Sequence, residues 1–239
     1  MAPPWLKPGV RQANKMGSKS RKHFDDSAED IDNLVGLHDA MVALSEADGE
    51  QVDEGLEVLF RSSVVLMVSH WEAYVEDIVA EAVEHLVKHV PEPQKLPKKI
   101  RQIVSKEIQQ SHNELEMWQL AQDGWRTYLK TRLTKHQEDR NRNFNTPKAA
   151  ATGEFISSVL GLADVTSKWS WVGVTSDEAK KRLDELVKVR GQIAHRGRVT
   201  QQLNKRFVED HLALLRRLVS KTGGPINAHL KKVTGSGLF

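Results

Sequence analysis

Arg190 and His195 are the residues of this chain whose types and spacing point most directly to chemistry. A histidine side chain takes up or releases a proton near neutral pH, and a guanidinium stays charged and offers a fork of donors that fits a phosphate. Together they suit the attack of a hydroxyl on a phosphodiester. RNA carries that hydroxyl on its own ribose, so such a reaction needs a base, an acid and a cation, and it needs no metal.

The segment 176–196 is expected to be a helix that positions both residues. Thr175 followed by Glu178 forms a capping box, which satisfies free backbone N–H groups at a helix start, and Gly197 suits its end. Steps of three and four residues then produce an apolar stripe formed by Leu183, Leu186, Val187, Ile193 and Ala194. Arg190 falls on this stripe, where a charge is unfavourable unless it is paired or used.

A second helix carries a charge of opposite sign on an apolar face. Residues 58–87 are dense in apolar side chains, which predicts a central helix packed on several sides. Glu72 is the acid on its stripe of Val65, Val68, Val75 and Val79. We therefore predict that Glu72 meets Arg190 or His195 in the interior. The pair is either a structural ion pair that fixes helix register or part of a functional site.

The five-residue spacing poses a geometric problem for a shared site. Side chains five positions apart on an ideal helix point about 140° away from each other, so Arg190 and His195 do not face one phosphate. Either the helix is distorted near Gly191, because glycine is a weak helix former, or two copies of the helix meet across a two-fold axis. We favour the second solution.

Composition restricts the class of protein. The 239 residues are 39% hydrophobic, enough for one substantial core, and the absence of cysteine excludes disulfide scaffolds and cysteine-ligated metal centres. Neither a secretory signal nor a membrane-spanning segment is visible, and we expect a cytoplasmic protein. Residues 1–24 hold six Lys or Arg and no acid, so the positive net charge of +3 belongs to this basic leader.

Periodicity predicts an all-α fold, a homodimeric helical bundle around a long central helix. We divide the chain into a basic flexible leader (1–24), a helical domain (25–222) and a C-terminal tail (223–239). Residues 136–147 lack apolar periodicity and are expected to form a surface loop, and Gly223-Gly224-Pro225 should end the last helix. The predicted helices cover residues 25–47, 52–90, 98–122, 124–135, 148–162, 176–196 and 201–221.

Other groups of residues have simpler explanations. Glu81, His85 and His89 share a helix face at ligand spacing, although a solvated face explains them better than a metal site. Trp71 and Tyr74 are expected in the core. Two further tryptophans, at positions 169 and 171, lie in a connector, where packing is favoured over a role as a lid or partner contact.

The sequence resembles the HEPN domains, all-helical dimeric domains associated with nucleic acids and nucleotides, and in particular their RiboL-PSP-type branch. Arg190 and His195 resemble the Arg-x4-6-His signature of these domains. Segment 69–76 resembles the aromatic-Glu-x-Tyr segment of that branch, and segments 144–147 and 159–162 also fit it. The resemblance covers roughly residues 58–220.

The resemblance implies metal-independent endoribonuclease activity without a cofactor, often in toxins or antiviral-defence effectors. It makes His195 the acid–base residue and Arg190 the residue that stabilises the phosphate, each acting with its symmetry mate, while Glu72 orients one of them. A polar residue, often asparagine, commonly follows the signature arginine, and Gly191 stands there instead. We predict further RNA contacts from Gln192, Arg196, Arg198, Asn145 and Lys148.

Two alternatives to the ribonuclease remain. One is a non-catalytic dimeric module that binds RNA, a nucleotide or a protein, because some members of the family are partners or sensors. The other is an antitoxin-like protein that acts with a nucleotidyltransferase. Under the ribonuclease hypothesis the expected partners are a second copy, the RNA substrate, and an antitoxin or defence-system protein, with no membrane.

Overall fold

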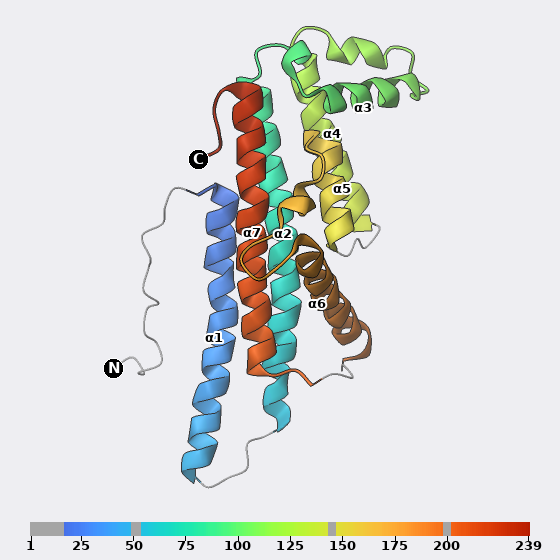
Figure 1. Ribbon diagram of the computed structural model, residues 1–239. Helices are drawn as coiled ribbons and strands as arrows, with labels where there is room; N and C mark the ends of the chain where they lie inside the picture. Colours follow the sequence, from blue (N-terminus) through green and yellow to red (C-terminus); the bar gives the residue numbers. More distant parts are fainter. Residues whose placement is uncertain (1–16, 49–53, 143–146, 198–201) are drawn as a thin grey trace, which may run out of the picture.

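The computed structural model of the protein describes residues 17–48, 54–142, 147–197 and 202–239, with the backbone alone for residue 54 and residues 136–142. In this part of the chain there are seven α-helices and no strand, apart from an isolated bridge between Trp171 and Val174 (Figure 1). The predicted all-α fold is confirmed. The helices are α1 (Lys19–Asp48), α2 (Glu57–His89), α3 (Lys98–Gln109), α4 (Gly124–Arg142), α5 (Ala149–Leu160), α6 (Ser176–Arg196) and α7 (Lys205–Thr234).

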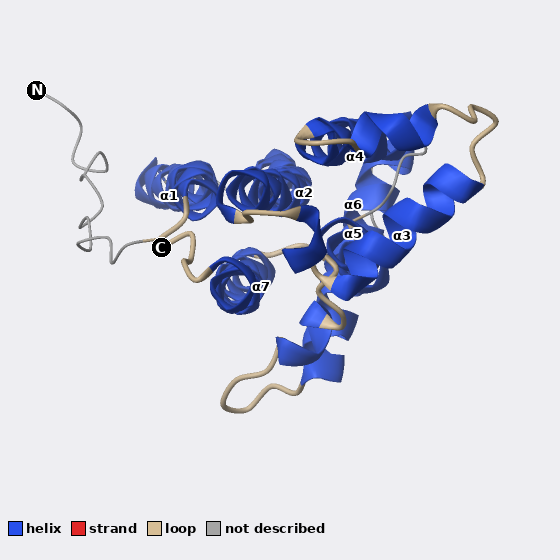
Figure 2. Ribbon diagram, turned by 90° about the horizontal axis from the view of Figure 1, so that it is seen from above, coloured by secondary structure: helices blue, strands red, loops and turns tan. Residues whose placement is uncertain are grey.

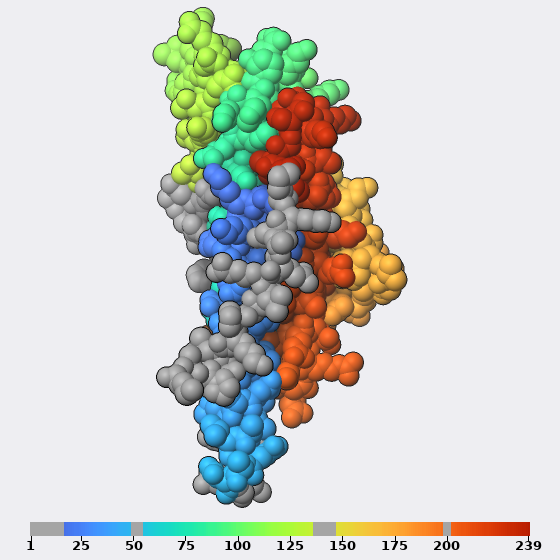
Figure 3. Space-filling view, turned by 90° about the vertical axis from the view of Figure 1, so that its left-hand side faces the viewer, coloured from blue at the N-terminus to red at the C-terminus, as the bar shows by residue number. Residues whose placement is uncertain are grey.

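The three longest helices lie side by side. The central helix α2 contacts both α1 and α7, and α4, α5 and α6 pack on its other side, as the view from above shows (Figure 2). On the face seen in Figure 3, α1 and α7 run next to each other. Four short 3₁₀ helices join these elements, at Glu54–Leu56, Pro93–Lys95, Glu116–Leu120 and Val165–Lys168.

The predicted central helix is confirmed, and its burial follows from its composition. The α2 side chains that are buried point in several directions, toward α1, α7 and α6 alike. Trp71 is fully buried, packs edge-on against Trp169 at 5.8 Å between ring centroids, and donates from Nε1 to the Pro147 carbonyl. Tyr74 donates its hydroxyl to the Val219 carbonyl of α7 at 2.8 Å. Burial also raises the pKa of the Tyr74 phenol. The core positions predicted for Trp71 and Tyr74 are confirmed.

The predicted start of the first helix was wrong. Helix α1 begins at Lys19 rather than at Asp25, so residues 19–24 belong to the bundle, with Ser20 and Phe24 buried. The reason is a cap supplied from α2. Glu81 accepts from the backbone N–H groups of Lys19 and Ser20 and from the Ser20 hydroxyl. A carboxylate at a helix N-terminus satisfies free N–H groups and favours the helix dipole.

The third and fourth helices were also misplaced. Helix α3 ends at Gln109, and the rest of the predicted helix is turns and the 3₁₀ helix Glu116–Leu120. A side chain at Gly124 would lie against the Gln119 carbonyl, so this tight return requires glycine. Helix α4 continues to Arg142, through residues predicted as a surface loop. Polarity alone did not end this helix, because the predicted loop contains no proline before position 147.

The last helix passes through the predicted break. Helix α7 extends to Thr234 and includes Gly223, Gly224 and Pro225. Pro225 cannot donate to the preceding turn, which costs about 3 kcal/mol in a helix interior. Two features offset this cost. Ile226 and Leu230 are fully buried, and Gly223 lets the Tyr74 hydroxyl approach, since a Cβ there would lie 3.0 Å from it. The residues assigned to a tail therefore form packed helix as far as Thr234.

No helix in the part of the chain that the structure describes is both long and apolar enough to cross a membrane.

Candidate functional site

The predicted meeting of α2 and α6 is confirmed. Nη2 of Arg190 lies 3.8 Å from Oε2 of Glu72, which is an ion pair rather than a close hydrogen bond. The side chains are 19% and 30% exposed, so the pair lies at the rim of the helix interface and not in the interior as predicted. An arginine at a rim keeps part of its donor fork available to a ligand.

Helix α6 positions the site as its sequence predicts. The hydroxyl of Thr175 accepts from the backbone N–H of Glu178, and Gly197 ends the helix in the left-handed conformation at φ 68°. The inner face buries Leu183, Leu186 and Val187 against the core. This packing fixes the rotation of the helix and leaves its last turn at the surface.

His195 lies in that last turn and is exposed. Among the described residues it makes no hydrogen bond and no ion pair, so no described residue occupies its ring nitrogens. The helix is continuous from Ser176 to Arg196, which removes the proposed distortion near Gly191. In one copy of the chain, Arg190 and His195 therefore keep the divergence of about 140° that an ideal helix gives them.

Glu72 lies on the predicted valine stripe of α2. Val68, Val75 and Val79 of its stripe are fully buried, whereas Val65 and Glu72 are partly exposed. The stripe therefore runs along the border where α6 covers α2, and Glu72 marks the point where solvent reaches this border.

The predicted RNA contacts are only partly placed together. Gln192 is half-buried and Arg196 exposed, both on α6 beside the pair, and Lys148 is exposed at the start of α5. Arg198 and Asn145 lie outside the described residues. The start of α5 is tied to α6 because Oδ1 of Asp184 accepts from the Ala149 backbone N–H at 2.8 Å.

One histidine next to the site was not singled out from the sequence. His70 lies two residues before Glu72, and its Nε2 is buried without a hydrogen-bond partner within the described part of the chain. Burial lowers its pKa, and Asp30 and His23 of α1 are the charges that act on it. His70 therefore belongs to the α1–α2 contact and not to the Arg190 pair. Nothing in the sequence marks it, because its burial arises from tertiary packing.

Glu81, His85 and His89, whose spacing was better explained by a solvated face than by a metal site, make other contacts. Glu81 caps α1, His85 hydrogen-bonds through Nε2 to the Ser236 carbonyl, and the rings of His85 and His89 stack at 4.1 Å. No three His, Asp or Glu side chains among the described residues lie close enough together to hold a metal ion. The face is thus occupied by structural contacts rather than being simply solvated.

The connector tryptophans are mainly packing residues. Trp169 is fully buried and donates from Nε1 to the Thr222 hydroxyl at 3.0 Å, whereas Trp171 is partly buried against the core. Packing, the favoured interpretation, is confirmed for Trp169.

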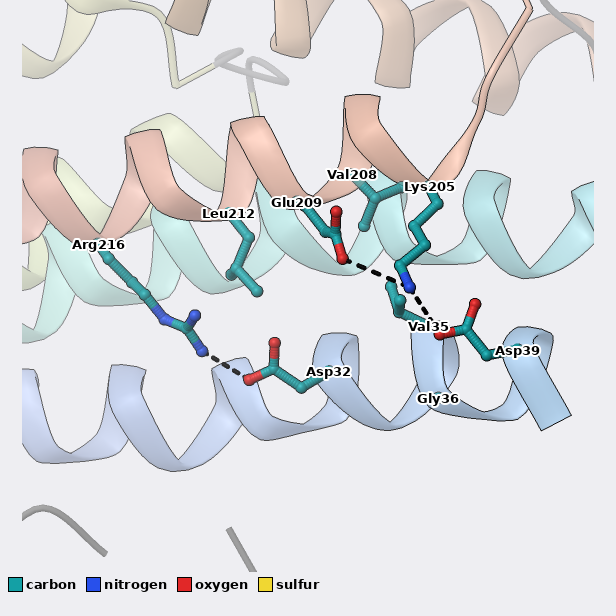
Figure 4. Close-up of a pocket in the computed structure, with 9 residues that line it drawn as sticks. All are labelled: Asp32, Val35, Gly36, Asp39, Lys205, Val208, Glu209, Leu212 and Arg216. Carbon is teal, nitrogen blue, oxygen red and sulfur yellow. Dashed lines mark hydrogen bonds and ion pairs between the residues drawn. The ribbon is translucent and has the colours of Figure 1, made fainter. Parts of the chain in front are cut away.

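A groove of about 310 Å³ between α1 and α7 is lined by acids and cations around an apolar floor (Figure 4). Its cations are already paired. Arg216 lies 2.6 Å from Asp32, and Lys205 lies 2.7 Å from Asp39. The hydrogen bond from Lys205 holds the pKa of Asp39 below its usual value, and the same bond raises the pKa of Lys205. Such mutually satisfied pairs hold two helices together.

An all-helical bundle whose α6 carries an arginine and, five residues later, an exposed histidine has the architecture and signature of a HEPN domain. The model of the RiboL-PSP-HEPN family matches residues 25–224, and the chain belongs to this family. No curated protein and no solved structure matches the chain.

Proposed function

We propose that this protein is a metal-independent endoribonuclease that cleaves RNA through its own 2′-hydroxyl. The observation that carries the proposal is the pairing of Arg190 with Glu72 at a solvent-exposed rim, one and a half turns before the exposed His195. Glu72 holds the guanidinium near the surface, and the imidazole is free of other partners among the described residues. Membership of a HEPN family supports the assignment of these roles.

The reaction follows from the two side chains. The neutral imidazole of His195 removes the proton of the 2′-hydroxyl, and this oxygen attacks the adjacent phosphorus. Arg190 stabilises the additional negative charge on the pentacoordinate phosphate. The bond to the 5′-oxygen breaks, and a protonated imidazole donates the proton that this oxygen needs. The products are a 2′,3′-cyclic phosphate and a 5′-hydroxyl, and the protons balance without a co-reactant.

A homodimer supplies the missing geometry. Because α6 is regular, one copy directs Arg190 and His195 to different sides, and the second imidazole comes from the partner. Val58, Ser62 and Ser69 are exposed and share the face of Glu72 at helical spacing, which presents small side chains to a second copy. Leu37, Met41 and Leu44 of α1 are also exposed at helical spacing. These surfaces support self-association.

The non-catalytic alternative is favoured by two observations. Gly191 provides no polar side chain next to Arg190, and the 3.8 Å ion pair is also what a register-fixing contact would form. In that case the same dimer binds RNA, a nucleotide or a protein partner without cleaving it.

The deciding experiment compares the wild type with His195→Ala on a pool of single-stranded RNA in EDTA. We expect the wild type to cut the RNA and leave 2′,3′-cyclic phosphate ends, and the variant to lose about 10²–10⁴ of the rate while remaining dimeric. His112→Ala is the matched control, since His112 is also exposed. Wild-type protein that binds RNA but leaves it intact would refute the enzyme and favour the binding module.

A cellular readout tests the proposed role as a toxin or defence effector. Induced expression of the wild type should slow growth, whereas expression of His195→Ala at the same level should not. A strain whose growth is equally affected by both proteins would show that the toxicity does not come from cleavage.

A further inference from the structure

Helix α3 has one apolar face and one strongly basic face. Ile100 and Val104 are buried against the bundle. On the other side, four exposed cations form what we call the α3 basic face: Lys95, Lys98, Arg101 and Lys106. The three within the helix lie within an arc of about 140°, since each residue advances by about 100°. These three charges therefore point away from the core together, and Lys95, in the 3₁₀ helix just before α3, is exposed beside them in sequence.

These cations have no acidic partners. None of the four forms an ion pair within the described part of the chain. The nearest acid in sequence, Glu107, is already held by Arg132, whose Nε lies 2.9 Å from its Oε2. Arg101 donates only its Nε to the Leu96 carbonyl, which leaves the tip of the guanidinium for another acceptor.

Neighbouring Lys99 differs from these four residues. Its Nζ donates to the Ser157 hydroxyl of α5 at 2.6 Å, so this lysine helps to attach α3 to the bundle. Helix α3 also packs closely on Gly161, which follows α5 in the left-handed conformation. A Cβ at this position would lie 3.0 Å from Ile100. The α3 basic face is thus presented on a firmly attached helix.

Two charges of this face, Lys98 and Arg101, do not stabilise the helix that carries them, whereas Lys106 in its last turn does. Lys98 lies in the first turn, where the helix dipole favours acids, and no side chain caps this end. Lys98 and Arg101 also lie three residues apart on the helix, a spacing at which like charges repel. A bound polyanion would convert both unfavourable features into favourable ones.

We propose that the α3 basic face binds the phosphate backbone of single-stranded RNA and extends the substrate contact beyond Arg190 and His195. The proposal rests on the proposed function, because RNA is the polyanion that the reaction requires. Helix α5 lies between the two sites, with Asp184 of α6 at its start and Lys99 of α3 near its end (Figure 1). It is about 18 Å long, and Arg190 lies six residues beyond Asp184 along α6, so we expect that only an RNA of several nucleotides reaches both sites.

The experiment measures binding of a fluorescent 20-nucleotide single-stranded RNA by full-length His195→Ala protein at several salt concentrations. The test variant adds Lys95→Gln, Lys98→Gln, Arg101→Gln and Lys106→Gln. We expect its Kd at 0.1 M salt to rise at least about tenfold, and the slope of log Kd against log salt to fall by about 0.7 for each lost phosphate contact. Unchanged affinity and slope would overturn the proposal.

A matched variant separates this face from net charge. It removes the same number of exposed or half-exposed cations from α6 and α7, at Lys181, Lys221, Arg217 and Lys232, and should bind RNA nearly as well as its parent. Equal losses in both variants would overturn the proposal. Binding to vesicles of anionic lipid is measured for the same proteins. If the α3 substitutions weaken binding to the vesicles but not to RNA, the proposal is also overturned. Circular dichroism verifies that each variant folds.

Kinetics distinguish failure of this proposal from failure of the proposed function. With His195 intact, the four α3 substitutions should raise KM for a long RNA at least about tenfold while kcat changes less than about threefold. If the wild type cuts no RNA, the proposed function fails, and the binding comparison still decides the role of α3. If the wild type cuts RNA and the α3 substitutions leave both Kd and KM unchanged, this inference alone is wrong.

Discussion

Two pairs of helices in this protein are joined by arginine–carboxylate contacts of very different quality. Between α1 and α7, Arg216 and Asp32 approach to 2.6 Å and largely neutralise each other (Figure 4). Between α2 and α6, Arg190 and Glu72 approach only to 3.8 Å, although their side chains are less exposed. The close pair is in solvent and the loose pair is partly desolvated, the reverse of what stability alone would favour.

The difference indicates where charge is available for a ligand. A guanidinium with close contact to one carboxylate has little to gain from a phosphate, whereas one that is positioned but loosely paired can accept a second anion. Partial burial strengthens that interaction, because the effective dielectric is lower than in water. The loose pair at the α2–α6 rim is therefore consistent with the proposed site, and the close pairs of the α1–α7 groove are those of a structural contact.

The largest expected effect is on catalysis. Arg190→Ala should reduce the rate of RNA cleavage by about 10²–10³, because it removes a cation that stabilises the transition state. Arg216→Ala removes an arginine of similar size from the other contact and should leave the rate unchanged. Both rates are measured on the same RNA in EDTA. Equal losses in the two variants would show that the contacts do not differ in function.

Acid should weaken the fold through buried histidines, among them His211 at the α6–α7 contact. Burial lowers the pKa of His211, although its Nδ1 contacts the Phe207 carbonyl at 2.8 Å. A histidine whose folded pKa lies below the unfolded value of 6.5 contributes stability above that pH and loses it as the pH falls toward the folded pKa.

The pH dependence of His211→Gln tests this assignment. Urea unfolding between pH 7 and 5 should show a shallower loss of stability in the variant than in the wild type, by up to about 1.4 kcal/mol per pH unit for one proton. Parallel curves would assign the acid sensitivity to the partly buried histidines, such as His70 and His229, whose pKa burial also lowers.

Local patterns predicted the site helix well, because its determinants are local. The capping box at Thr175, the stripe from Leu183 and the terminal Gly197 all act within a few residues of one another, and the observed helix has the predicted bounds. The contact of Glu72 with Arg190 was also predictable, since each is a single charge on an otherwise apolar stripe.

The helix ends that were wrong depend on contacts between distant residues. Helix α1 starts six residues early because Glu81 caps it from α2, and α7 continues through Pro225 because Ile226 and Leu230 are buried beyond it. Local rules begin a helix at a run of acids and end it at glycine or proline, and tertiary packing overrides both rules here. The partial exposure of Arg190 was missed for the same reason, because a stripe does not reveal where the covering helix ends.

A smaller effect is expected at the glycine that follows Arg190. A Cβ at Gly191 would meet no heavy atom of another element within 4 Å, so Gly191→Ala should stabilise α6 by about 1 kcal/mol. Chemical denaturation measures this gain. If Glu72 positions Arg190 and the reaction does not require the helix to bend at Gly191, the cleavage rate of the variant should not fall. A stabilised but inactive variant would instead show that the site needs a distortion at Gly191.

The smallest effect concerns the second ion pair of the groove, between Lys205 and Asp39. The pair is close, at 2.7 Å, but both side chains are nearly half exposed, so its coupling energy should be only about 0.2–1 kcal/mol. A double-mutant cycle with Lys205→Met and Asp39→Asn measures it from urea unfolding, and 1 M salt should reduce it further. A coupling above about 2 kcal/mol would mean that α1 and α7 are held together mainly by charge. Their contact would then no longer be a valid reference for the α2–α6 rim, since Arg216 would be as difficult to replace for structural reasons as the proposed function makes Arg190.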